Sequence, residues 1–276
     1  MIYLFTSIIG VIAGFVSGFF GIGGGIIFVP ALLFLFEAQG FSRGDAMLLA
    51  TGTSLFAVVM STLSGIQRHG KMKHIKFAPL WAILLGVIIS SAFGVVLTNE
   101  IGGNALRYLL VAFNIWAITR MLKKAFSKKE SESNESTTPV SSNEITFKMK
   151  SLLFLLGITV GIQSAMLGVG GGVLVVPVLI ALLRYPASNA VGTSIFVAFT
   201  ASLVAVIFRA LLSSVSIVAP AGTIGTVNFP LALAIGIPAI LGAQLGAIIH
   251  GKVGEVRWFY FVFVALLVLV SLQAIF

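Results

Sequence analysis

The sequence contains no cysteine, and only 9% of its 276 residues are charged. Without cysteine the chain has no disulfides, no thiolate metal ligands and no cysteine nucleophile. The low charge accompanies 58% hydrophobic residues and a mean hydropathy of +1.12, whereas soluble domains are about half apolar and a quarter charged. Uncharged apolar runs of about 18 or more residues recur, and each is long enough to cross a hydrocarbon core roughly 30 Å thick as a helix. These features predict an all-α polytopic membrane protein.

Acidic residues are scarce as well, at eight against 17 Lys and Arg. All eight acids lie in connections or at the edges of the apolar runs, and the three histidines lie near predicted cytoplasmic ends. A membrane enzyme would need a carboxylate pair, a His/Glu metal cluster or an activated nucleophile inside the bilayer. The sequence shows none of these, so we expect neither an enzyme nor a metal or cofactor site. The same lack of a carboxylate inside the apolar runs predicts weak or absent coupling of the function to protons.

Basic residues are concentrated in two connections. The segment 68–76 holds four Lys or Arg, and 120–150 holds seven. Cytoplasmic loops of membrane proteins are enriched in these residues, so both segments are predicted to be cytoplasmic and both chain ends to lie outside. Two spans, 77–98 and 105–122, join the segments, and two crossings return the chain to the same side. Membrane topology thus accounts for the net charge of +9, and we expect no nucleic-acid partner.

The polar, serine-rich segment 123–150 is predicted to be a flexible cytoplasmic linker between two transmembrane repeats, 1–122 and 151–276. Each repeat begins with a long apolar run, 2–36 or 151–183, that contains three consecutive glycines. The 35 residues of the first run would make one helix roughly 52 Å long, which exceeds a membrane span. Each run is therefore expected to break at its glycines into a hairpin that either enters part-way or crosses the membrane twice.

The two hairpins are related in sequence. Residues 10–30 and 157–177 align without a gap and share nine identities in 21 positions. Each repeat adds three further transmembrane helices to its hairpin, and this odd total predicts that the second repeat is inverted relative to the first. Inverted repeats with broken helices at corresponding positions are typical of secondary transporters.

The glycine triplets predict an anion site near the middle of the membrane. A helix that restarts after a triplet has up to four unpaired N–H groups and a partial positive charge of about half a unit. Such helix ends bind anions, and glycine lets the backbone approach a ligand closely. In inverted repeats the two restarts would enter from opposite faces and meet. The predicted substrate-binding residues are Gly23, Gly24, Gly25, Gly170, Gly171, Gly172, Ser17, Ser164, Gln163, Thr53, Ser54, Thr193, Ser194, Gln244 and Arg209.

Several of these residues have a structural alternative. Hydroxyls in membrane helices often bond their own backbone, which applies to the Thr-Ser pairs at 53–54 and 193–194. Gln244 could instead hydrogen-bond between helices, and Arg209 could extend to the outer surface. Glycines four residues apart, as at 10 and 14, usually allow close packing of two helices.

Three features together resemble a known family. They are the paired glycine-rich hairpins ending in Pro30 and Pro177, the elements "ATGTSLF" at 50–56 and "AVGTSIF" at 190–196, and the polar central linker. The sequence resembles the TauE/SafE family of membrane transporters, also called the sulfite exporter family, over essentially the whole chain apart from the linker.

The resemblance implies transport of sulfite, sulfoacetate, another organosulfonate or a related small anion across the plasma membrane. We therefore predict a secondary transporter that exports a small sulfur-containing anion by alternating access around the midplane site. The alternative is an anion channel or a permease for a different small solute. The expected partners are the anionic substrate and the lipid bilayer, and the oligomeric state is left open.

Overall fold

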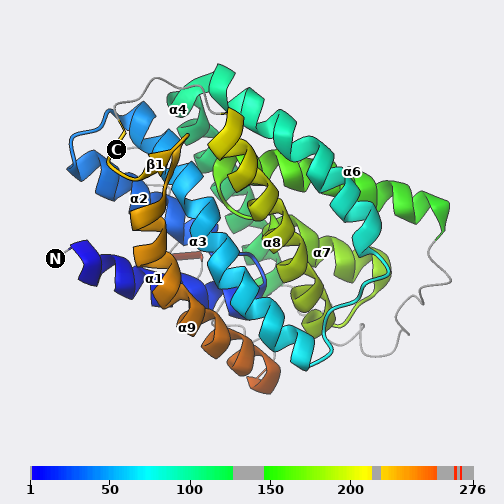
Figure 1. Ribbon diagram of the computed structural model, residues 1–276. Coiled ribbons are helices and arrows are strands. Elements are labelled where there is room, and N and C mark those ends of the chain that lie inside the picture. The colour runs from blue at the N-terminus through cyan, green and yellow to red at the C-terminus, as the bar shows by residue number, and fades with distance from the viewer. Residues whose placement is uncertain (1, 127–145, 213–218, 254–263, 266–267, 269–276) are drawn as a thin grey trace.

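The structure is a computed structural model, and it describes residues 2–126, 146–212 and 219–253, together with 264, 265 and 268. The predicted linker over 123–150 and the last span of the second repeat lie largely outside these residues. Helices make up most of the described chain, and a short hairpin of two antiparallel strands precedes the last of them (Figure 1). In chain order the elements are α1 (Ile2–Phe20), α2 (Gly25–Ala38), α3 (Arg43–Lys71), α4 (Leu80–Phe126), α6 (Phe147–Leu167), α7 (Gly172–Leu183), α8 (Ala187–Leu212), β1 (Thr223–Ile224), β2 (Val227–Asn228) and α9 (Phe229–Val253).

Five of the described helices, α3, α4, α6, α8 and α9, are long and apolar enough to cross a membrane, which confirms the prediction of an all-α membrane protein. Helix α4 is interrupted at Gly102, whose φ of 74° and ψ of 166° are not helical, so α4 contains two consecutive helices at the predicted spans 77–98 and 105–122. Helices α2 and α7 have only 14 and 12 residues, about 21 and 18 Å of helix. Both are shorter than the hydrocarbon core.

Glycines bring two pairs of helices into backbone contact. Helix α1 lies along α9, and a Cβ atom added at Gly10 or Gly18 would overlap the carbonyl oxygen of Ile235 or Ala243 respectively. Because the residue numbers rise together, the two helices run in the same direction. Helix α4 lies along α6 in the same way, with Gly157 against the backbone of Ile83. The packing role predicted for glycines spaced four apart is therefore confirmed.

Helices α3 and α8 lie in the middle of the bundle (Figure 1). Gly65 faces Ile195 near one end of their contact, and Arg209 bonds to Thr51 near the other. The residue numbers of α3 therefore rise as those of α8 fall, and the two helices run in opposite directions.

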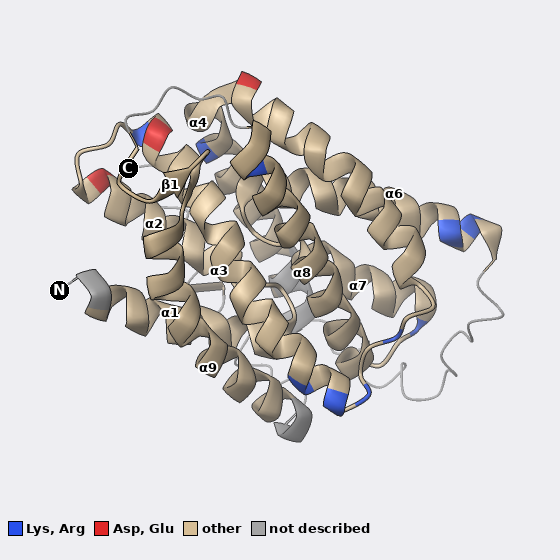
Figure 2. Cartoon of the chain, in the orientation of Figure 1, with Lys and Arg blue, Asp and Glu red and all other residues tan. Residues whose placement is uncertain are grey.

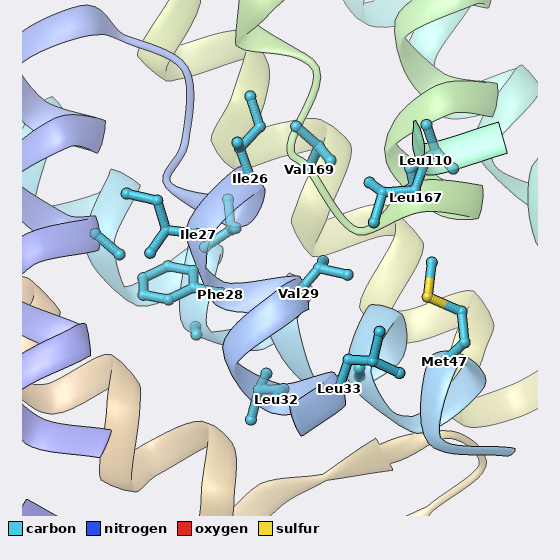
Figure 3. Packing of buried hydrophobic residues seen from close by; sticks show 14 of the residues in the cluster. Ile26, Ile27, Phe28, Val29, Leu32, Leu33, Met47, Leu110, Leu167 and Val169 are labelled. Carbon is cyan, nitrogen blue, oxygen red and sulfur yellow. The ribbon is translucent and has the colours of Figure 1, made fainter. Parts of the chain in front are cut away.

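Helix α2 is the core of the first hairpin. Phe34 is 51% exposed, but every other residue from Gly25 to Phe36 is buried. A helix that is apolar all round needs such an environment. Figure 3 shows its side chains packed against α3, α4 and the end of α6, with the labelled residues Ile26, Ile27, Phe28, Val29, Leu32, Leu33, Met47, Leu110, Leu167 and Val169.

Charge is divided between the ends of the bundle. Figure 2 shows the acidic positions at the end that carries β1 and most of the basic positions toward the opposite side. The described acids are Glu37, Asp45 and Glu100, whereas α3 ends in the basic segment 68–76. The described acids and the basic segment 68–76 therefore lie at different ends of the bundle.

Candidate functional site

Both predicted helix breaks are present, and they begin and end at corresponding residues. Helix α1 ends at Phe20 and α2 begins at Gly25, while α6 ends at Leu167 and α7 begins at Gly172. The residues that cap the restarts, Gly24 and Gly171, have left-handed φ values of 74° and 75°. L-residues with a Cβ avoid this conformation, so glycine is required there. We call residues 21–24 the first glycine loop and 168–171 the second glycine loop.

The two glycine loops lie against each other. A Cβ atom added at Gly25 would overlap the carbonyl oxygen of Gly168, and one added at Gly172 would overlap the carbonyl oxygen of Gly21. In Figure 3, Val169 of the second loop lies beside Ile26 at the start of α2. Each helix restart is therefore covered by the opposite loop, and side chains at these glycines would force the loops apart.

Two serines bind the glycine loops from outside. Ser54 of α3 donates its hydroxyl to the carbonyl oxygen of Gly168 at 3.0 Å, and Ser194 of α8 donates to that of Gly21. Each central helix thus fixes the loop of the other half of the chain. The sequence predicted these hydroxyls as substrate contacts, and the structure shows them bonded to backbone oxygens.

The neighbouring threonines hold the segments that precede two helices. Thr53 Oγ1 accepts a hydrogen bond of 3.0 Å from the backbone N–H of Asn228, immediately before α9. Thr193 Oγ1 accepts one of 3.0 Å from the N–H of Lys76, shortly before α4. The Gly-Thr-Ser sequences at 52–54 and 192–194 therefore connect each central helix to a glycine loop and to the start of a further helix.

The N–H groups at the start of the restarted helices have few backbone acceptors. Hydrogen bonds within the restarted helices begin with the N–H groups of Ile27 and Leu174, which donate to Gly24 and Gly171 respectively. Among the described residues, no backbone acceptor is found for the N–H groups of the caps Gly24 and Gly171 themselves. These groups lie at the positive ends of α2 and α7.

Three buried polar side chains near the second loop have no hydrogen-bond partner within the described chain. They are Gln163 and Ser164, in the last turn of α6, and Ser202 of α8. Gln163 is 9% exposed, the two serines are fully buried, and Ser202 Oγ lies 3.3 Å from the position of a Cβ at Gly170. An unpaired buried polar group costs about 1–3 kcal/mol, so such groups need an explanation.

The first loop has the corresponding hydroxyls, but they are paired. Ser17 Oγ lies 3.5 Å from Ser61 Oγ, and Ser61 also donates to the carbonyl oxygen of Val58 at 3.1 Å. Ser164, the counterpart of Ser17, therefore has an unpaired hydroxyl where that of Ser17 is paired. Sequence reasoning found Ser17, Gln163 and Ser164 but missed Ser202, which lies seven residues before Arg209 and hence on the same helix face.

Arg209 of α8 is fully buried. The alternative prediction, that its side chain extends to the outer surface, is therefore wrong. Its Nη2 donates to the carbonyl oxygens of Ala165 and Met166 at 2.9 and 3.3 Å, and Nε also donates to Ala165 at 3.2 Å. Further bonds go to the hydroxyls of Thr51 and Thr226, at 3.2 and 3.3 Å. The guanidinium thus binds the carbonyl end of α6, just before the second loop, where the helix dipole favours a positive charge.

No described carboxylate pairs with Arg209; the ion pair found between described residues joins Arg43 and Glu37 near the acidic end. The strand hairpin that supplies Thr226 was not predicted from the sequence.

At the end of α1, His69 takes the place that Arg209 has at the end of α6, and its Nε2 lies 3.2 Å from the carbonyl oxygen of Gly18. Its Nδ1 faces that of His74 at 3.3 Å.

Gln244 is the one predicted side chain that the structure places on an exposed surface. The glycines on either side of it, Gly242 and Gly246, pack against α1, so Gln244 points to the opposite face of α9. Within the described residues, no group of three or more metal-binding side chains is found.

Comparison with known proteins gives one family. The family model described as "Sulfite exporter TauE/SafE" matches residues 6–274. A "probable membrane transporter protein" of Methanocaldococcus jannaschii is 30% identical over 247 residues, which are 89% of this chain and 85% of the relative. A second one, of Bacillus subtilis, is 26% identical over 100% of this chain and 98% of its own length. No solved structure matches the chain.

Proposed function

The chain belongs to the TauE/SafE sulfite exporter family, and from this premise we propose that it exports a small sulfur-containing anion through the cell membrane. The substrate class is sulfite, sulfoacetate or another organosulfonate. The observation that carries the proposal is the contact between two glycine loops, each at the start of a helix, beside buried polar side chains without partners.

An anion suits this arrangement because the groups around it donate hydrogen bonds. The caps Gly24 and Gly171 present backbone N–H groups at the positive ends of two helices. The amide of Gln163 and the hydroxyl of Ser164 can both donate to oxygen atoms of a substrate. We assign direct contact with the substrate to the two glycine loops, Gln163 and Ser164.

The remaining predicted residues act on the loops. Ser54 and Ser194 bind the carbonyl oxygens of the facing loops, and Arg209 binds the end of α6. Ser17 has a partner in Ser61 and contributes to the first loop. We propose that these residues position the N–H groups.

Alternating access would follow from two inverted repeats, 1–122 and 151–276. Two observations favour inversion. Helices α3 and α8 run in opposite directions, and the contacts between the glycine loops are reciprocal, with Gly25 against Gly168 and Gly172 against Gly21. One repeat rocking against the other around the loops would expose the site first to one face of the membrane and then to the other. The basic segment 68–76 and the linker would lie in the cytoplasm and both chain ends outside.

Export requires little coupling to protons. An anion that leaves a negative interior gains roughly 2.3 kcal/mol per charge per 100 mV of membrane potential. Transport of methanesulfonate, whose charge does not change near neutral pH, driven by an imposed pH gradient at zero potential would contradict this part of the proposal.

Flux through proteoliposomes tests the function. We expect uptake of radiolabelled sulfite or methanesulfonate above that of empty liposomes, with an at least tenfold loss in Gln163→Leu, because the substrate loses an amide contact worth about 1.4 kcal/mol or more. Thr159→Val is the matched control on α6, since Thr159 is exposed and its hydroxyl donates to Leu155 within the helix. The absence of flux for every sulfur-containing anion tested would refute the proposal.

A further inference from the structure

Several buried polar groups near the second glycine loop have no hydrogen-bond partner within the described chain. Ser202 Oγ is fully buried, has no partner among the described residues and lies 3.3 Å from the position of a Cβ at Gly170. Ser164 Oγ and both polar atoms of the Gln163 side chain also have no hydrogen-bond partner among the described residues. Because Gly170 has no side chain, the Ser202 hydroxyl has access to the loop backbone.

The fixed charge at the two breaks amounts to about one positive unit. Helices α1 and α6 end there and α2 and α7 begin there, so their opposite partial charges of about half a unit cancel in pairs. Arg209 contributes a full positive charge through its contacts with Ala165 and Met166, two and three residues before Gly168. No described carboxylate lies within ion-pair distance to compensate it.

We propose that the site selects a singly charged anion, and that Ser202 donates a hydrogen bond to it. The inference rests on the proposed transport function and specifies its substrate class. A single negative charge balances Arg209, whereas a second one would remain uncompensated in a buried site. The cost of removing an ion from water rises with the square of its charge, but its attraction to Arg209 only doubles. Hydrogensulfite and organosulfonates with one charge should therefore bind better than sulfite dianion, sulfate or thiosulfate, and better than sulfoacetate, whose carboxylate gives it a second charge.

The Ser202 contact has a consequence for the empty protein. An unpaired buried hydroxyl destabilises the fold, so its removal should stabilise the protein while weakening substrate binding. We expect Ser202→Ala to raise the melting temperature of the ligand-free protein by about 2–8 °C and to weaken anion binding about tenfold. A hydroxyl with a purely structural role would give the opposite change in melting temperature.

Thr200→Ala is the matched control. Thr200 lies on the same helix, and its hydroxyl donates to the carbonyl oxygen of Phe196 at 3.1 Å. This substitution should leave anion binding unchanged and should not raise the melting temperature.

Binding to the purified full chain would be measured by thermal shift and calorimetry, with methanesulfonate as the monoanion and sulfate as the dianion. We expect methanesulfonate to bind at least about tenfold more tightly. Sulfite loses its second proton near neutral pH, so its apparent affinity should fall between mildly acidic and mildly alkaline pH while that of methanesulfonate stays constant. The methanesulfonate series also controls for titration of the protein.

The outcomes separate this inference from the proposed function. Sulfate that binds as tightly as methanesulfonate would overturn the selection of a single charge and leave the transport proposal intact. Unchanged affinity in Ser202→Ala, or a lowered melting temperature without ligand, would overturn the Ser202 contact. The failure of all sulfur-containing anions to bind or to be transported would instead refute the function.

Discussion

The contact between the two glycine loops makes Gly172→Ala an informative substitution. Gly172 is the first residue of α7, and its φ lies outside the left-handed region, so alanine suits its backbone conformation. Helix propensity alone would favour alanine by up to about 1 kcal/mol. The added Cβ, however, would overlap the carbonyl oxygen of Gly21 and lie 2.7 Å from Ile22 Cα.

The steric cost should exceed the gain in propensity. Both obstructing groups are backbone atoms of the first loop, and Ser194 bonds the same Gly21 oxygen, so the loop cannot move without losing a hydrogen bond. Overpacking of this kind costs about 1–3 kcal/mol, and a lost hydrogen bond about 1 kcal/mol more. We expect a net loss of about 1–3 kcal/mol in the free energy of unfolding.

Thermal unfolding in detergent, followed by tryptophan fluorescence, would measure the loss. A lowering of the melting temperature by about 2–8 °C is expected. Gly25→Ala should behave alike, since its Cβ would meet Gly168 and Val169 of the second loop. Because both substitutions separate the same two loops, the double variant should lose less than the two single losses added together.

Gly70→Ala provides the control for the effect of helix propensity. Gly70 lies in α3, and the nearest atom to its added Cβ is Ile75 Cδ1 at 3.8 Å. This variant should be as stable as the parent or more stable. If Gly172→Ala and Gly25→Ala followed the control, the loops would not be in contact and the proposed site would be wrong.

Three further predictions concern the residues that hold the loops. Arg209→Lys keeps the charge but loses the planar fork that reaches four acceptors, and it should lower unfolding stability by about 2–4 kcal/mol; an unchanged melting temperature would contradict this. Thr53→Val and Thr193→Val should each cost about 1–2 kcal/mol, because each leaves a backbone N–H unpaired; a loss in only one would show that the two elements are not equivalent. Burial, and then the charge of Lys76, lowers the pKa of His74 from 6.5, so the folded state binds its proton less well than the unfolded state. The resulting stability is present above pH 6.5 and decreases as the pH falls, and His74→Gln should show a smaller decrease of melting temperature with acidification than the parent.

The helices and their breaks were predictable from local sequence. Apolar length identifies a span without knowledge of its neighbours, and a glycine triplet interrupts a helix whatever surrounds it. The left-handed caps Gly24 and Gly171 follow directly from this chemistry. The inverted arrangement of the repeats and the cytoplasmic position of the linker stay predictions.

The functions of the polar side chains could not be predicted in the same way. Thr53 and Ser54 are adjacent in sequence, yet one accepts from Asn228 and the other donates to Gly168, both far along the chain. Hydroxyl spacing within one helix cannot show which backbone oxygen lies opposite. Ser202 was missed because the sequence does not distinguish it from neighbouring hydroxyls such as that of Thr200, which bonds within its own helix. Gln244 was included although the glycines four residues apart at 242 and 246 mark the opposite, packed face of α9.

The differences between the two breaks are as informative as their similarity. The backbone repeats closely, from the left-handed caps to the serines that bind the opposite loops, and this repetition places two helix starts together. The side chains do not repeat: His69 stands at the end of α1 where Arg209 stands at the end of α6, and Ser17 is paired where Ser164 is not.

A substrate with one charge and a few oxygen atoms needs only one set of donors. We infer that the second break makes most of the polar contacts with the anion and that the first break lies on the opposite side of the anion. Substitutions at Ser164 should therefore reduce transport more than the same substitutions at Ser17. Equal effects in flux assays would show instead that both breaks bind the anion alike.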